Sequence, residues 1–193
     1  MNKPTLAGRG NYAFIDNQNL NLGIQKVGWK LNWRKFREFL RAKYGVEKAF
    51  MFIGYMPDHE ELYNQMHELG YLIVLKPTLQ MRDMPIEGMA PLEKAEPKDG
   101  DEKKPAIKGN VDAELVLYAV KEMPNYDKAI IVSGDGDFYS LVEYLAENNK
   151  LMHLMTPNRQ YSTLLKPFDS YIIRLDQFQR ELRYFTKKSR PPQ

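Results

Sequence analysis

Short apolar runs alternate with amphipathic segments along most of this chain, and no other feature constrains its fold as strongly. Six of the runs are interpreted as strands, at residues 12–15, 48–55, 71–75, 129–132, 151–155 and 171–175. Most of them are continuously apolar, as expected for strands that are covered on both faces of a parallel sheet.

The amphipathic segments between those runs are predicted to form helices. One helix covers about residues 33–44, and another begins at Asp58, which forms a capping box with Glu61. A third covers about residues 111–123, and a fourth begins just after Asp137. Strands that alternate with helices predict an α/β fold, a three-layer α/β/α domain with a mostly parallel central sheet.

A single domain over residues 1–193 is expected, because this length suffices for one hydrophobic core. Residues 82–108 break the pattern, since they are rich in Pro, Gly, Glu and Lys and have no apolar period. We interpret them as a flexible insertion, which is either a flap over a substrate or a surface loop that the fold tolerates. Residues 187–193 are interpreted as a frayed basic tail.

Two features of the sequence bear on the cellular compartment of the protein. The chain has no cysteine, which excludes disulfides and thiolate metal sites. No apolar run approaches the roughly 20 residues that a membrane helix needs, and the first residues do not resemble a secretory signal. We therefore expect a cytoplasmic protein without a membrane partner.

The net charge is only +3, but the basic residues are concentrated in two segments. Residues 26–48 carry a net charge of +6 and residues 180–190 a net charge of +4, so the rest of the chain carries −7. An acidic body with basic patches suits a polyanion bound through its phosphates, although a solvated charged face explains the same pattern. The predicted nucleic-acid-binding residues are Arg34, Arg37 and Arg41, on one side of the first predicted helix.

Three aspartates follow predicted strands directly. Asp16 ends the first strand, in FIDNQNL, and Asp135 and Asp137 follow the fourth, in IIVSGDGDF. The carboxyl ends of parallel strands meet at one edge of a sheet, where ligands bind at a switch point. If these two strands are neighbours, their axes lie about 4.8 Å apart, so Asp16 and Asp135 are expected to share an ion. Gly134 and Gly136 are predicted to let the backbone turn tightly between the acids.

A fourth carboxylate reaches the same edge from a helix. The helix over about 111–123 precedes the fourth strand and packs antiparallel to it, so its first turn lies where that strand ends. Asp112 falls in the middle of the apolar arc of this helix, whereas Glu114 falls on its solvent side. An inward-facing carboxylate requires a partner, since an unpaired buried charge is costly.

Each aspartate also has a structural explanation, because Asp137 or Asp112 alone is a suitable helix cap. Only one residue can occupy a cap, however, and four carboxylates at one edge repel one another unless a cation is present. Mg²⁺ and Mn²⁺ prefer oxygen ligands, and such ions activate water and stabilise the leaving oxygen of a phosphodiester. The cluster of Asp16, Asp112, Asp135 and Asp137 is therefore the predicted metal and catalytic site.

The motifs that carry these acids resemble those of the NYN domain family, the LabA-like branch of the PIN-like nucleases. The matching segments are FIDNQNL, KGNVDAELVLYA, IIVSGDGDF and STLLKPFDSYIIRL, which together span nearly the whole chain. The resemblance implies a PIN-like fold whose aspartates bind Mg²⁺ or Mn²⁺ and hydrolyse RNA, with Asn17 and Ser133 as supporting polar groups. Many relatives carry a further aspartate six residues after the position of Asp112, and here that residue is Tyr118.

Three hypotheses for the function remain. The leading one is a metal-dependent ribonuclease that binds single-stranded RNA through its backbone. The second is an RNA-binding or regulatory module with a degenerate site, which Tyr118 favours. The third, a nucleotide-sugar transferase that holds Mn²⁺ with Asp135 and Asp137, is disfavoured because Asp16 and Asp112 belong to the same predicted cluster. The sequence leaves open whether the protein forms a homo-oligomer.

Overall fold

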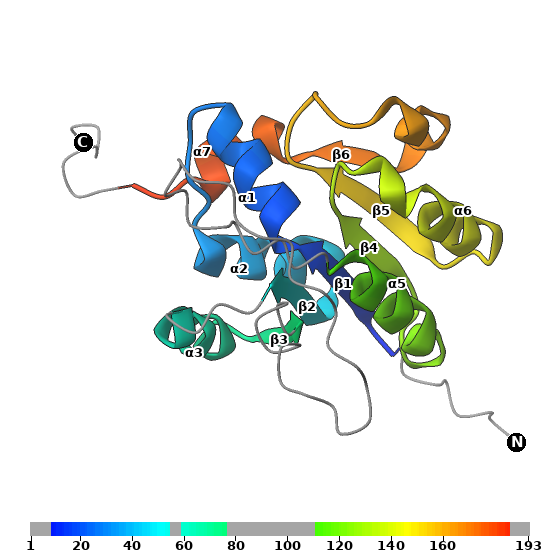
Figure 1. Ribbon diagram of the computed structural model, residues 1–193, viewed down its shortest axis with the longest axis horizontal. Coiled ribbons are helices and arrows are strands. Elements are labelled where there is room, and N and C mark those ends of the chain that lie inside the picture. The colour runs from blue at the N-terminus through cyan, green and yellow to red at the C-terminus, as the bar shows by residue number, and fades with distance from the viewer. Residues whose placement is uncertain (1–8, 55–58, 77–110, 186–193) are drawn as a thin grey trace, which may run out of the picture.

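A computed structural model describes residues 9–54, 59–76 and 111–185 (Figure 1). The strands are β1 (Asn11–Asp16), β2 (Val46–Gly54), β3 (Tyr71–Lys76), β4 (Ala129–Val132), β5 (Leu151–Thr156) and β6 (Ile172–Arg174). The α-helices are α1 (Asn17–Lys26), α2 (Trp33–Tyr44), α3 (Glu60–Glu68), α5 (Asp112–Lys121), α6 (Tyr139–Glu147) and α7 (Gln179–Leu182). The predicted insertion at 82–108, the tail at 187–193 and the capping residue Asp58 lie outside the described residues.

The six strands form one sheet in the order β3-β2-β1-β4-β5-β6, and every neighbouring pair is parallel. The predicted α/β fold with a parallel central sheet is confirmed. The strand order reverses between β1 and β4, which pair directly from Tyr12 opposite Ala129 to Ile15 opposite Val132. This pairing puts the carboxyl ends of β1 and β4 side by side at the switch point.

Side chains of the central strands alternate between two hydrophobic cores, one on each face of the sheet. In β1, Ala13 and Ile15 pack into the core that α1, α2, α3 and α7 cover. Tyr12 and Phe14 pack into the other core, which α5 and α6 cover. The same alternation explains why the strands read as continuous apolar runs, because each of their faces is buried.

Capping residues set the ends of helix α2. Its first turn is capped by Asn32, whose side-chain oxygen accepts a hydrogen bond from the Lys35 backbone N–H at 3.1 Å. The helix ends at Gly45, which adopts the left-handed conformation with φ of 60°. Strand β2 begins at the next residue, so α2 runs back across the sheet from its carboxyl edge to its amino edge.

The helix predicted over about 111–123 is shorter in the structure, where α5 ends at Lys121 and a 3₁₀ turn follows over Met123–Asn125. Pro124 lies inside that turn and has no backbone N–H to continue an α-helix. Among the described residues, no helix is long and apolar enough to cross a membrane.

Candidate active site at the carboxyl edge of the sheet

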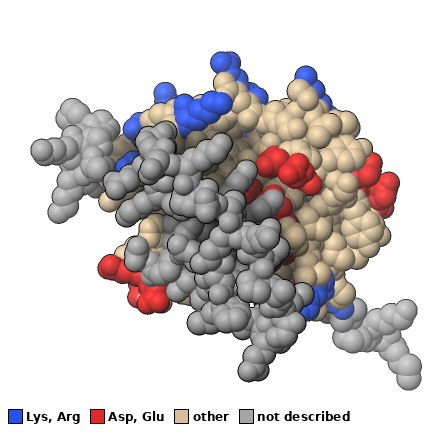
Figure 2. All heavy atoms as spheres, viewed as in Figure 1, with Lys and Arg blue, Asp and Glu red and all other residues tan. Residues whose placement is uncertain are grey.

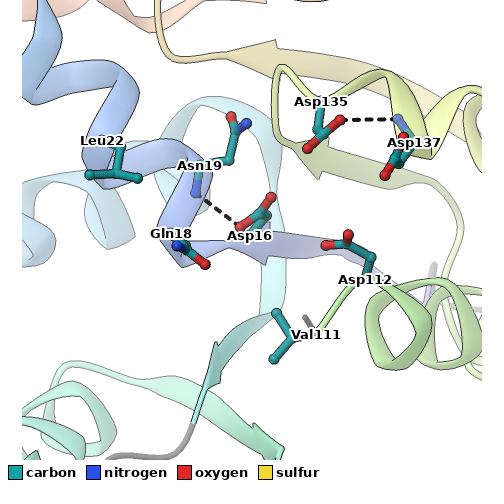
Figure 3. Close-up of a pocket in the computed structure, with 8 residues that line it drawn as sticks. All are labelled: Asp16, Gln18, Asn19, Leu22, Val111, Asp112, Asp135 and Asp137. Carbon is teal, nitrogen blue, oxygen red and sulfur yellow. Dashed lines mark hydrogen bonds between the residues drawn. The ribbon is translucent and has the colours of Figure 1, made fainter. Parts of the chain in front are cut away.

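All four predicted aspartates line one pocket of about 260 Å³ at the carboxyl edge of the sheet. Figure 3 shows Asp16 at the end of β1, Asp112 at the start of α5, and Asp135 and Asp137 after β4, all around the same space. The rest of the lining consists of Gln18, Asn19, Leu22 and Val111. Three segments that are distant in sequence therefore bring four carboxylates to one place.

Asp16 is the most buried of the four, with 5% of its surface exposed. Its Oδ1 accepts a hydrogen bond from the Asn19 backbone N–H at 3.0 Å, so it caps helix α1, and its Oδ2 accepts one from Ser133 Oγ at 3.1 Å. Burial raises the pKa of Asp16, and the negative charges of Asp112 and Asp135 raise it further against the effect of the two hydrogen bonds. The fold thus holds this carboxylate in an electrostatically unfavourable environment.

The segment after β4 is held together by hydrogen bonds of its own. Ser133 is buried, and its Oγ accepts a hydrogen bond from the Asp135 backbone N–H at 3.1 Å while it donates to Asp16. Asp135 in turn accepts one from the Asp137 N–H at 3.1 Å and caps the 3₁₀ turn Gly136–Phe138. The cap position that the sequence left open for Asp137 therefore belongs to Asp135, and the Asp137 carboxylate is exposed at the pocket.

The two glycines of this segment do not serve the purpose that we predicted. Neither Gly134 nor Gly136 has a positive φ, so a tight left-handed turn is not the reason for them. A Cβ on Gly136 would lie 2.4 Å from Ser162 Oγ, and one on Gly134 would lie 3.2 Å from Tyr161 Cβ. The glycines instead allow residues 161–164 to pack against the aspartate segment, with the Ser162 N–H donating to the Gly134 carbonyl at 2.9 Å.

Asp112 is the first residue of α5 and is half-buried. The residue in the cap position is Val111, and no side chain caps this helix end. The carboxylate of Asp112 lies in the pocket with that of Asp16 (Figure 3), close enough for its charge to raise the pKa of Asp16. The inward orientation predicted for Asp112 is therefore confirmed, whereas the alternative of a simple helix cap is wrong.

Glu114 is less exposed than we predicted. It forms an ion pair with Lys76, with 3.1 Å between Oε2 and Nζ, and its side chain is 30% exposed. This pair joins helix α5 to the end of β3. Glu114 does not line the carboxylate pocket, in agreement with its exclusion from the predicted site.

The NYN domain family matches residues 12–176, which include all four aspartates and most of both cores. This chain belongs to the NYN domain family. The family assignment inferred from FIDNQNL and IIVSGDGDF is thereby confirmed.

Two individual proteins are similar over nearly the whole NYN domain. The chain is 23% identical over 185 residues to the low amplitude and bright protein LabA of Synechococcus elongatus, covering 93% of this chain and 89% of that protein. Its fold is similar to the crystal structure of a protein of unknown function from Vibrio parahaemolyticus, with a TM-score of 0.63 and 19% identity. That alignment covers 95% of this chain and 100% of the other, and at this identity it shows the fold alone.

Tyr118, at the position of the further aspartate in the pattern of many NYN relatives, contributes to the hydrophobic core. Its ring centroid lies 5.8 Å from that of Phe50 and 5.7 Å from that of Phe52, both in β2. It does not line the carboxylate pocket. An aromatic side chain thus packs on the sheet at this position, about 1.7 helical turns after Asp112, the first residue of α5.

The sequence predicted Asn17 as a supporting residue of the site, but in the structure Asn19 lines the pocket instead. Asn17 is half-buried at the start of α1, but it does not line the pocket. Asn19 does line it, and its Oδ1 accepts a hydrogen bond from the Gly134 N–H at 2.9 Å, which ties α1 to the segment after β4. No local sequence signal identifies Asn19, because its side chain meets Gly134 only in the folded chain.

The three predicted RNA-binding arginines do not lie together with the carboxylates. Arg37 donates to the carbonyls of Gly70 at 3.0 Å, Val46 at 3.0 Å and Glu47 at 2.6 Å, and burial lowers its pKa. These carbonyls lie at the amino edge of the sheet, so the Arg37 guanidinium has a structural role. It is not part of the proposed RNA-binding surface. Arg34 lines a separate pocket beside Trp33, and Arg41 is exposed in the last turn of α2.

The chemistry of the pocket suits a hard divalent cation. Carboxylate oxygens and the amides of Gln18 and Asn19 are the donors that Mg²⁺ and Mn²⁺ prefer. In the described part of the chain, however, no three acidic or histidine side chains converge closely enough to hold an ion. The donor set agrees with the prediction, and the binding of metal stays a prediction.

Proposed function

We propose that this NYN domain is a metal-dependent ribonuclease in which Asp16, Asp112, Asp135 and Asp137 hold Mg²⁺ or Mn²⁺ against an RNA phosphodiester. The observation that carries the proposal is the meeting of four carboxylates in one pocket at the switch point of the sheet. Membership in a family of PIN-like nucleases supports a role in binding or cleaving nucleic acid.

The electrostatics of the pocket support a cationic ligand. Burial raises the pKa of Asp16, and the negative charges of Asp112 and Asp135 beside it raise it further. A divalent cation reverses the sign of the interaction, because each carboxylate then faces a positive charge. A buried carboxylate whose pKa is raised by burial and by neighbouring charges is a candidate for a functional group.

The residues of the pocket have separate tasks in the proposed reaction. A Mg²⁺ or Mn²⁺ ion held by these aspartates would supply an activated water and would offset the charge that develops on the phosphodiester. Asp16 is the fixed ligand, since hydrogen bonds from Asn19 and Ser133 orient both of its oxygens and each oxygen keeps a further lone pair. Asp137 is exposed, and its carboxylate meets the substrate side of the pocket.

The substrate that fits this site is single-stranded RNA, because a splayed strand can bring one phosphate into a pocket bounded by α1 and α5. Figure 2 shows a group of acidic side chains near the middle of one face and basic side chains along the upper margin of the same face. Basic groups at a margin attract the backbone without reading its bases, so we expect affinity to fall steeply with salt.

Cleavage of labelled single-stranded RNA tests this proposal. Purified protein is expected to cleave in Mg²⁺ or Mn²⁺ and not in EDTA, and Asp135→Asn is expected to reduce the rate by about 100-fold or more, since it removes a metal ligand. Asp127→Asn is the matched control, because Asp127 is an exposed acid that bonds the Gly10 N–H at the opposite edge of the sheet. Cleavage that survives both EDTA and Asp135→Asn would refute the proposal.

Tyr118 favours a second candidate, an RNA-binding module that does not cleave. Its ring packs on Phe50 and Phe52, so a carboxylate is absent at this position and the pocket has four acids. This alternative predicts RNA binding with no cleavage in either metal. The same assay distinguishes the two candidates when it is paired with a binding measurement in EDTA.

A further inference from the structure

A second pocket of about 230 Å³ adjoins the carboxylate pocket along helix α1. Asn19 and Leu22 line both pockets, so these two side chains form the wall between them. The second pocket is otherwise lined by Gly23, Lys26, Gly134, Pro157, Asn158 and Gln160. We call it the Lys26 pocket.

The floor of the Lys26 pocket is rigid. A Cβ on Gly23 would lie 2.6 Å from Pro157 Cβ, so α1 packs directly on the loop after β5. Asn158 is 3% exposed, and its side chain donates to the Gly23 carbonyl and accepts from the Gln160 N–H, each at 2.6 Å. Gly134 is fixed by its bond to Asn19. The pocket is therefore formed before any ligand arrives.

The charge changes sign from one pocket to the next. The carboxylate pocket is lined by four acids, whereas the Lys26 pocket is lined by one lysine and no acid. Lys26 is exposed, and across the described residues it forms no ion pair. Side chains on a helix lean toward its N-terminus, so Lys26 leans toward Leu22 and the shared wall.

Leu22 supplies an apolar surface at that wall. It is 57% exposed although it belongs to a helix whose other apolar residues, Leu20 and Ile24, are fully buried. An exposed leucine between an acidic pocket and a basic one suits the ribose or base that joins two phosphates.

We propose that the Lys26 pocket is a second substrate subsite, which binds the backbone phosphate next to the one that enters the carboxylate pocket. Lys26 contacts this phosphate, and Leu22 contacts the nucleoside between the two. The inference rests on the proposed ribonuclease function. It adds the path of the bound RNA, which crosses helix α1 from the carboxylate pocket toward Lys26.

Salt-dependent binding of a single-stranded RNA oligonucleotide, measured in EDTA, tests the subsite without any need for cleavage. Lys26→Gln is expected to reduce the magnitude of the slope of log K against log salt by about 0.7, which is the contribution of one phosphate contact in a single strand. Lys26→Arg is expected to restore the slope. Lys121→Gln is the matched control, because Lys121 is an exposed lysine in the last turn of α5, at the opposite edge of the sheet.

Leu22→Ala provides an independent readout, because it removes an uncharged contact. It is expected to weaken binding by a similar factor at every salt concentration and to leave the slope unchanged. Both side chains are exposed, so the variants are expected to unfold at the temperature of the natural chain.

The outcomes separate this inference from the proposed function. An unchanged slope in Lys26→Gln, or an equal change in Lys121→Gln, would overturn the subsite even if the protein cleaves RNA. A slope that depends on Lys26 in a protein that never cleaves RNA would support the subsite and refute the proposed cleavage.

Discussion

The two edges of the parallel sheet are both polar, but their polar groups are used in opposite ways. At the amino edge, Arg37 donates to three carbonyls, Lys150 Nζ to the Tyr126 carbonyl at 2.7 Å, and Lys128 Nζ to two oxygens of Asn149 at 2.6 Å. At the carboxyl edge, four carboxylates share one pocket, and the pKa of Asp16 is raised.

This contrast assigns the amino edge to stability, and it supports the proposal that the carboxyl edge binds a ligand. At the amino edge, cationic side chains donate hydrogen bonds to backbone carbonyls, and these bonds stabilise the folded chain. At the other edge, burial and the like charges of Asp112 and Asp135 disfavour the ionised form of Asp16. A bound cation would offset that effect. Polar residues alone therefore do not identify the site, whereas the raised pKa of Asp16 among neighbouring carboxylates distinguishes the carboxyl edge from the amino edge.

The largest effect on stability is expected at the amino edge, from Arg37→Ala. Loss of three hydrogen bonds from a half-buried guanidinium is expected to lower the free energy of unfolding by about 2–3 kcal/mol. Arg41→Ala, on the exposed side of the same helix, is expected to change it by less than about 0.5 kcal/mol. Denaturant unfolding measures both. If Arg37→Ala left stability intact and weakened RNA binding, the structural role of Arg37 would be wrong.

A smaller loss of stability is expected at the carboxyl edge, from Ser133→Ala. The buried hydroxyl donates to Asp16 and accepts from the Asp135 N–H, so its removal leaves both groups without that partner. We expect a loss of about 1–2 kcal/mol. We also expect a drop in Mn²⁺ affinity of about 10- to 100-fold, because Ser133 orients Asp16, the proposed metal ligand.

Ser140→Ala is the control for that comparison, since Ser140 is exposed on helix α6. Calorimetric titration with Mn²⁺ and denaturant unfolding are measured on both variants. A Ser133→Ala protein with unchanged Mn²⁺ affinity would show that the hydroxyl stabilises the segment after β4 and does not orient a metal ligand.

The smallest expected effect is a dependence on pH. The pKa of Asp16 is raised above its ordinary value of 3.8, so the folded chain binds this proton more readily than the unfolded chain. In EDTA, the stability of the natural chain relative to Asp16→Asn should therefore increase as the pH falls through the raised pKa and level off below 3.8. Unfolding followed from neutral to acidic pH measures it, and a relative stability that decreases with falling pH would contradict the raised pKa.

Much of the fold could be predicted because the central strands β1 and β4 are buried on both faces and the long helices on one. Continuous apolar runs such as 129–132 and the stripe of Phe36 and Leu40 carry this information directly. The sequence did not predict that β1 pairs with β4; it predicted only that Asp16 and Asp135 would meet if these strands were neighbours. The order of strands depends on contacts between distant segments, which a local pattern does not show. The end of α5 was misplaced because Pro124 breaks the helix after an apolar stripe that continues to Met123.

The aspartates of the site could be predicted from the sequence, whereas the contacts that hold them in place could not. Asp16 and Asp135 follow strands, so the topology alone places them together. The role of Asn19 and the close packing at Gly136 depend on side chains from segments that meet only in three dimensions. The same reason explains Arg37, whose helical spacing suggested a surface patch while its partners come from β2 and the turn before β3.

The central claim is that the carboxyl edge is the edge that binds a divalent cation, and calorimetric titration of the purified protein with Mn²⁺ tests it most directly. The natural chain and Asp127→Asn are expected to bind Mn²⁺ with similar affinity, because Asp127 lies at the amino edge. Asp135→Asn is expected to lose most of that binding. Absence of binding to the natural chain, or equal binding by Asp127→Asn and Asp135→Asn, would contradict the claim.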